Sequence, residues 1–105
     1  MNNYSEDYYD WVEKQLKTAI GICNIYLTEE DIVEVKEKIH NKEYGIALQA
    51  LCYRFVANKI QIPSDASEII HELIFKMGMK DKKDEDYWFW IEVKPFLMKK
   101  KGTPI

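Results

Sequence analysis

The chain has 105 residues, of which 47% are apolar and 31% are charged, and its formal net charge is −3. This length fits one domain, and this composition predicts a packed core and not a disordered chain. No apolar stretch reaches the roughly 20 residues that a membrane-spanning helix needs, so we predict no membrane contact. The acidic balance also argues against a nucleic-acid partner, because dedicated nucleic-acid binders usually carry a strongly basic face.

The cysteines and the N-terminal residues indicate the cellular compartment of the protein. Cys23 and Cys52 both lie in apolar helical contexts, and two cysteines are too few for a disulfide framework or a four-ligand zinc site. The N-terminus lacks the basic start and following apolar stretch that mark a signal peptide. We therefore predict buried, reduced thiols in a cytoplasmic protein.

Apolar residues recur at helical spacing along most of the chain, which predicts an all-α fold. The first predicted helix runs from about Glu6 to residues 22–25. Thr28 is predicted to cap the second helix, because its hydroxyl can accept a backbone N–H and three carboxylates follow it. Asn41 is predicted to end that second helix in the left-handed conformation.

The third predicted helix covers about residues 43–59 and is apolar almost all round, which is typical of a buried central helix. Pro63 disfavours helix at the residue before it, so a connector is predicted there. Ser64 and Asp65 are predicted to cap a fourth helix. Gly78 is predicted to end it with a positive φ.

A charged loop is predicted to lead into a last helix that carries four consecutive aromatic residues, 87–90. At about 100° per residue these side chains span most of the helix circumference, so at least one of them should face outward. Residues 99–105 are expected to fray. The predicted fold is a single compact bundle of about five helices over residues 1–105, with the central helix buried.

The sequence offers little that points to catalysis or to a cofactor. His40 and His71 are 31 positions apart, and neither has a second ligand at metal-binding spacing. There is no glycine-rich phosphate-binding pattern. The carboxylates lie at predicted helix starts and in a charged loop, where capping and solubility alone would place them. We therefore predict no enzyme activity, no catalytic residue, no metal site and no cofactor.

Charge is distributed unevenly along the chain. Residues 1–45 hold ten acidic and five basic residues, a net charge of −5, whereas residues 46–105 hold eight acidic and ten basic residues, a net charge of +2. An anionic surface on the first two helices would speed encounter with a basic partner and disfavour wrong ones. Aromatic residues, which are enriched in binding hot spots, gather near both ends of the chain.

The segment from Thr28 to Met79 resembles a known family. It contains a capped acidic helix, the string Glu-Tyr-Gly opening an apolar helix, a linker ending in Ile-Pro-Ser, and a helix closing with Met-Gly-Met. In these features it is similar to the small helical immunity proteins of bacterial polymorphic toxin systems, specifically the MafI-like group and related proteins of contact-dependent growth inhibition. The matching residues are Glu43, Tyr44, Gly45, Ala47, Leu48, Leu51, Cys52, Ile62, Pro63 and Gly78.

The resemblance implies a protein that binds one cognate toxin domain and blocks it, as a monomer in a 1:1 complex. In such systems the toxin is often a nuclease, commonly an RNase, whose basic cleft an acidic protein can occupy. Because related immunity proteins share a scaffold and diverge at the interface, we place binding on exposed acidic and aromatic residues. The predicted partner-binding residues are Asp7, Tyr8, Asp10, Glu29, Glu30, Asp31, Glu34, Asp84, Glu85, Asp86 and Trp88.

Two other functions stay open from the sequence. The first is a small helical DNA-binding regulator, for which duplex binding should depend on salt concentration. The second is an adaptor subunit that uses its aromatic ends to assemble with other chains.

Overall fold

The computed structural model describes residues 6–97. This part of the chain forms five α-helices and two short 3₁₀ helices, which confirms the all-α prediction. The predicted frayed segment 99–105 lies outside the described residues. The elements are α1 Glu6–Cys23, η1 Asn24–Tyr26, α2 Glu29–His40, α3 Tyr44–Asn58, α4 Ser64–Lys76, α5 Tyr87–Val93 and η2 Lys94–Phe96.

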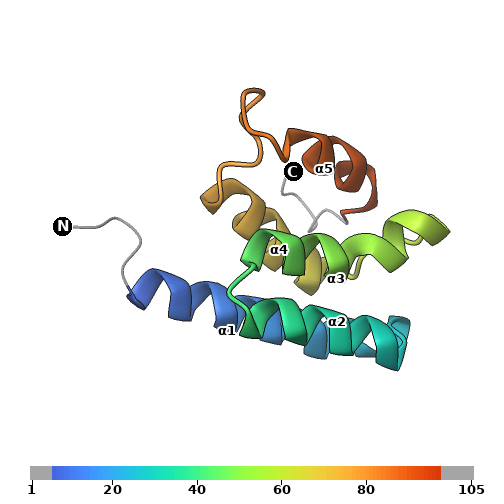
Figure 1. Cartoon of the computed structure of the whole chain (residues 1–105). Coiled ribbons are helices and arrows are strands. Elements are labelled where there is room, and N and C mark those ends of the chain that lie inside the picture. Colours follow the sequence, from blue (N-terminus) through green and yellow to red (C-terminus); the bar gives the residue numbers. More distant parts are fainter. Residues whose placement is uncertain (1–5, 98–105) are drawn as a thin grey trace.

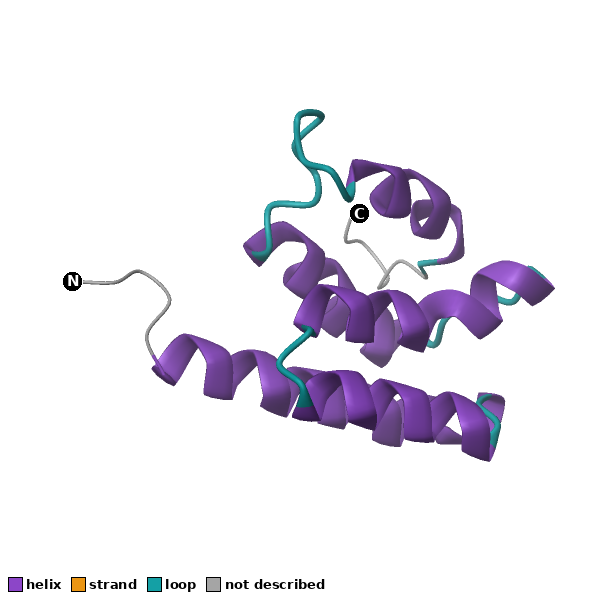
Figure 2. Cartoon of the chain, viewed as in Figure 1, coloured by secondary structure: helices purple, strands orange, loops and turns teal. Residues whose placement is uncertain are grey.

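The helices pack in two main pairs, α2 along α3 and α1 along α4, and α3 also contacts α1 and α5 (Figure 1). The long connection between α4 and α5, residues 77–86, forms the loop that stands out from the bundle in Figure 2. All five helices contribute buried side chains to one hydrophobic core. None of the helices within residues 6–97 has the length and apolar character needed to cross a membrane.

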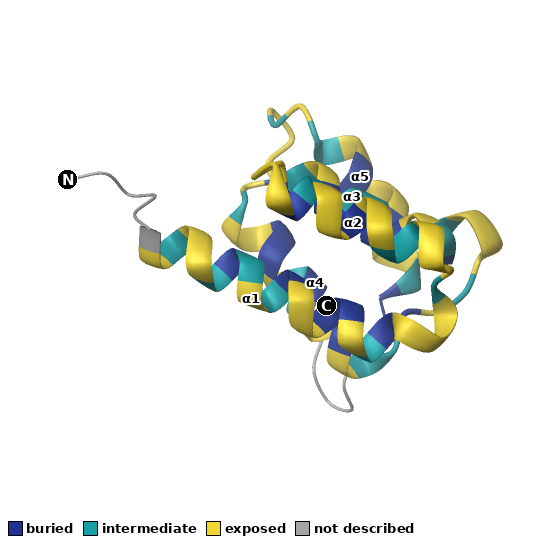
Figure 3. Ribbon diagram, turned by 60° about the horizontal axis from the view of Figure 1, so that its bottom comes forward, coloured by how far each residue is buried: buried dark blue, intermediate teal, exposed yellow. Residues whose placement is uncertain are grey.

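Helix α3 is the central helix that the sequence predicts over about 43–59, but it is not buried on every side, because Ile46 and Tyr53 are exposed. Its inner face looks toward α1 and α2, and buried residues line the inside of the bundle in Figure 3. The burial follows from the sequence, because apolar residues spaced three and four apart form one continuous stripe. The buried residues of this helix are Tyr44, Ala47, Leu48, Leu51, Cys52 and Phe55.

The start of α2 is as predicted, but its end is not. The Thr28 hydroxyl accepts the Asp31 N–H at 3.0 Å, and the Asp31 carboxylate accepts the Thr28 N–H at 3.0 Å, which is a capping box. Asn41, predicted to be left-handed, has a φ of −82°, and Lys42 takes the left-handed position with a φ of 61°. The reason is that α2 continues one residue further. The N–H groups of Lys42 and Glu43 then bond back to the last turn, at 2.9 and 2.8 Å.

The start of α4 also differs from the prediction of a Ser64–Asp65 cap. Pro63 is the N-cap residue, with no side-chain cap, and its carbonyl accepts the Ser67 N–H at 2.8 Å. The buried Ser67 hydroxyl donates to the Ile62 carbonyl at 3.0 Å, which ties the helix to its connector. Pro63 can hold this position because its fixed φ and missing N–H leave no donor to satisfy.

The connector between α3 and α4 is also held by the residues that follow α5. The Ile62 N–H donates to the Phe96 carbonyl at 2.8 Å, and Ile62 and Leu97 form an isolated parallel bridge. The Gln61 side chain donates to the Pro95 carbonyl at 3.1 Å. These contacts anchor the end of α5 against the α3–α4 connector, and so they fix where α5 lies on α3.

Candidate functional site

A shallow hollow of about 420 Å³ lies where α2, α3 and α5 meet, and it brings together residues that are far apart in the sequence. Of the predicted partner-binding residues, Asp31 and Glu34 of α2 and Trp88 of α5 line it. The remaining lining includes Tyr53 of α3 and Glu92 of α5. We call this surface, with Ile46 of α3, the acidic–aromatic hollow.

Large apolar side chains of the hollow are unusually accessible. Tyr53 is 62% exposed, Trp88 is 49% exposed and Ile46 is 47% exposed. Trp88 faces outward because the neighbouring Phe89 and Trp90 are buried in the core. This confirms the prediction that at least one of the four consecutive aromatic residues faces outward. Exposed Tyr and Trp beside an aliphatic residue supply contact area at low entropic cost, which suits protein binding.

The carboxylates of the hollow differ in whether they already form an ion pair within the chain. Both nitrogens of the Arg54 fork donate to Asp31, at 3.0 and 3.1 Å, and the Asp31 side chain is only 12% exposed. Arg54 foremost, and the Thr28 bonds with it, lower the pKa of Asp31 below its ordinary value. Glu34 and Glu92 are exposed and form no ion pair with any residue in the range 6–97. The negative charge available to a partner is therefore that of Glu34 and Glu92.

Replacing Asp31 with alanine should lower the free energy of unfolding by about 1–2 kcal/mol, because the change removes a capping partner and a bidentate ion pair. Urea denaturation followed by circular dichroism would measure this. The matched control is Glu34→Ala on the same helix, which should change stability by less than about 0.5 kcal/mol. Equal stability of the two variants would show that Asp31 has no structural role.

The other predicted binding residues of the first two helices lie outside this hollow. Asp7 and Tyr8 line a second hollow, of about 350 Å³, together with Glu72 and Lys76 of α4. Asp10 is exposed on α1. The acidic residues of the first half of the chain therefore do not form one continuous patch.

The start of α2 carries two more of the predicted residues. Glu29 and Glu30 are exposed in its first turn. Glu30 is one helical turn before Glu34, so these two residues share a face of α2. Glu30 also interacts electrostatically with Arg54, but it does not line the hollow.

The predicted residues of the loop before α5 hold the loop together. The Asp84 carboxylate accepts the Asp86 N–H at 2.8 Å, which is a local turn. Glu85 is exposed. Asp86 lines a third hollow, of about 320 Å³, to which Tyr8 also contributes. The structure thus joins Asp86 to the start of α1 and not to the acidic–aromatic hollow.

Tyr53, Ile46 and Glu92 belong to the hollow although the sequence did not single them out. The apolar character of α3 on all sides suggested that every face of it is buried. Helix α5 has only seven residues, so it covers part of α3 and leaves Tyr53 and Ile46 exposed. The sequence does indicate the position of Glu92. It follows Trp88 by four residues, so the two side chains lie on the same face of the helix.

Reactive and metal-binding groups are scarce in the described range. Burial raises the pKa of Cys23 to about 11, and burial foremost also raises the pKa of Cys52. Both thiols are free and buried, and so are protonated at neutral pH. Among residues 6–97, no three side chains of His, Cys, Asp or Glu come together in a way that could hold a metal ion.

His71 of α4 is half-buried against Trp90, with ring centroids 5.6 Å apart. Lys80 Nζ lies 3.2 Å from His71 Nε2 and 4.8 Å from the Trp90 ring centroid. Burial, and secondarily the Lys80 charge, lower the pKa of His71 below its ordinary value of 6.5. The neutral imidazole is therefore the form that fits this site.

Stability should fall as the pH is lowered below about 6.5, because the unfolded chain then binds a proton that folded His71 resists. The urea midpoint should be lower at about pH 5.5 than at about pH 7.5. The carboxylates with lowered pKa values, Glu13 and Asp31, titrate at lower pH than this window. His71→Gln should flatten the dependence, and an unchanged pH profile in that variant would assign the effect to another group.

Comparison with known proteins adds no assignment, since no protein-family model, no curated protein and no solved structure matches the chain.

Proposed function

We propose that the chain is a toxin-neutralising immunity protein that binds a basic protein domain through the acidic–aromatic hollow. The observation that carries the proposal is the combination of Glu34 and Glu92, which form no ion pair within residues 6–97, with exposed Tyr53 and Trp88. Tyr and Trp are enriched in protein–protein hot spots, and complementary charge near such anchors speeds association and disfavours wrong partners. The toxin identity of the partner comes from the resemblance of residues 28–79 to immunity proteins.

The proposed mechanism is occlusion of a nuclease cleft. A nuclease, and an RNase in particular, needs lysine and arginine side chains that bind the phosphates of its substrate. Glu34 and Glu92 would pair with those side chains in place of phosphate oxygens, while Tyr53 and Trp88 would exclude water from the contact. The complex would then contain one copy of each protein, formed in the cytoplasm where the toxin acts.

Co-expression tests the proposal in cells. The proposed toxin domain, taken from the product of the gene immediately upstream, would be induced in a bacterial host with and without this chain. We expect growth arrest with the toxin alone, growth with both, and recovery of a 1:1 complex on purification. Arrest in both cases, with no complex recovered, would contradict the proposal.

A further inference from the structure

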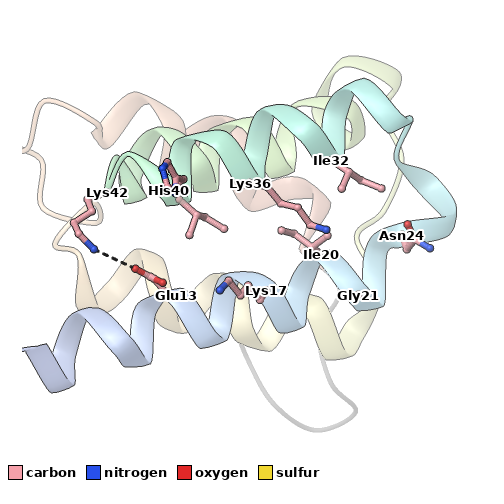
Figure 4. Close-up of a pocket in the computed structure, with 10 residues that line it drawn as sticks. Glu13, Lys17, Ile20, Gly21, Asn24, Ile32, Lys36, His40 and Lys42 are labelled. Atoms are coloured by element: carbon pink, nitrogen blue, oxygen red, sulfur yellow. Dashed lines mark ion pairs between the residues drawn. The ribbon is translucent and has the colours of Figure 1, made fainter.

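A larger groove, of about 1000 Å³, runs between α1 and α2 on another surface of the bundle (Figure 4). Its lining extends over residues 13–24 on one side and 32–42 on the other. At 1.5 Å per residue this is about 16 Å, or three turns of an α-helix. The apolar residues of the lining are Ile32, which is half-buried, and Ile20 and Ile39, which are 6% and 4% exposed, so Ile32 offers the most accessible apolar side chain to a ligand.

The charge of this groove is opposite to that of the chain segment that forms it. Residues 1–45 carry ten acidic and five basic residues, yet the groove is lined by Lys17, Lys36 and Lys42 and by one acid, Glu13. Glu13 is held by Lys42 at 3.7 Å and by the Tyr44 hydroxyl at 2.6 Å. Lys17 and Lys36 come from opposite walls and form no ion pair in residues 6–97. A negatively charged group bound in the groove would act as a shared counter-ion for Lys17 and Lys36.

Gly21 gives an independent indication that something approaches the groove closely. This glycine lies inside α1, where glycine weakens a helix relative to alanine. A Cβ added at Gly21 would meet no atom within 4 Å, so no contact among residues 6–97 requires a glycine there. Gly21 lines the groove, where the missing side chain would let a partner backbone come near.

We infer that the groove between α1 and α2 binds an amphipathic helix with acidic flanks, supplied by a partner protein. The apolar face of such a helix would lie on Ile20 and Ile32, and its carboxylates would reach Lys17 and Lys36. A fatty acid fits less well, because the cations are spread along the groove and not gathered at one end. A nucleic acid fits less well because the groove offers isoleucine and no aromatic stacking surface within its lining.

The test is a fluorescence anisotropy titration with a labelled peptide of about 15 residues, designed as a helix with leucines on one face and glutamates beside them. We expect the chain to bind this peptide and to bind a version with lysines in place of glutamates at least tenfold more weakly. Comparable binding of the two peptides would overturn the inference. So would tighter binding of a labelled single-stranded oligonucleotide that competes for the same lysines.

Variants of the chain complete the test. Lys17→Glu with Lys36→Glu should weaken peptide binding at least tenfold, while Lys14→Glu with Lys82→Glu, exposed positions outside the groove, should leave it unchanged. Gly21→Leu should keep or raise the urea midpoint, because leucine favours helix and its Cβ would meet no atom within 4 Å, yet should abolish peptide binding. Full binding by the stable Gly21→Leu protein, or equal loss in both lysine pairs, would refute the groove as the binding site.

Discussion

Replacing Leu51 with alanine is expected to lower the free energy of unfolding by about 2–5 kcal/mol, the range found for deleting a buried leucine side chain. Leu51 lies on the inner face of α3 with 0% of its surface exposed. Helix α3 contacts α1, α2 and α5, so a cavity at this position removes contacts from the helix that joins the two pairs of the bundle. Urea denaturation followed by circular dichroism would measure the loss.

The matched control for this change is Ile46→Ala in the same helix. Ile46 is 47% exposed, so its truncation removes less buried surface and should cost less than about 1 kcal/mol. Leucine and isoleucine differ in helix propensity by only a few tenths of a kcal/mol, so a difference of more than about 1 kcal/mol between the two variants reports burial. Equal losses would contradict the assignment of Leu51 to the core and of Ile46 to the surface.

Much of the fold could be predicted from local sequence patterns. The apolar stripe of α3, the capping box of Thr28 and Asp31, and the positive φ of Gly78 follow from rules that act within a few residues. Two of the predictions that failed concern helix ends, where neighbouring residues compete for the same position. Lys42 takes the left-handed position in place of Asn41, because the helix gains one more residue and two further backbone hydrogen bonds.

The candidate site could be predicted only in part, because packing decides which carboxylates remain available. Asp31 and Arg54 are 23 positions apart, and no local pattern indicates that they form a bidentate ion pair. Glu34 and Trp88 line the same hollow only because of where α5 lies against α3. The bonds from Ile62 to Phe96 and from Gln61 to Pro95 set that position, and they are tertiary contacts.

The acidic charge predicted for the first two helices is real but is divided by the fold. Glu34 lies in the acidic–aromatic hollow between α2, α3 and α5, whereas Asp7 lies in the hollow between α1 and α4. Between α1 and α2 themselves the lining is basic, with Lys17 and Lys36 on facing walls. Net charge along the chain therefore does not locate a binding surface, because helix rotation selects which side chains share a face.

Reversing the charges of Glu34 and Glu92 in the acidic–aromatic hollow tests the proposed function at its centre. In Glu34→Lys with Glu92→Lys, attraction to lysines and arginines of the toxin becomes repulsion. We expect the dissociation constant to rise by about 10- to 100-fold, equivalent to about 1.4–2.8 kcal/mol. Both residues are exposed, so the unfolding free energy should change little.

Glu72→Lys provides a control of the same kind, because Glu72 is exposed on α4 and lines the hollow that contains Asp7 and Tyr8. The decisive measurement is the dissociation constant between each purified variant and the proposed toxin domain, taken from the product of the gene immediately upstream, determined by isothermal titration calorimetry. The proposed function predicts a 1:1 complex that is weakened in the Glu34→Lys, Glu92→Lys protein and unchanged in Glu72→Lys. Unchanged affinity in the double variant, or no complex with the unaltered chain, would contradict it.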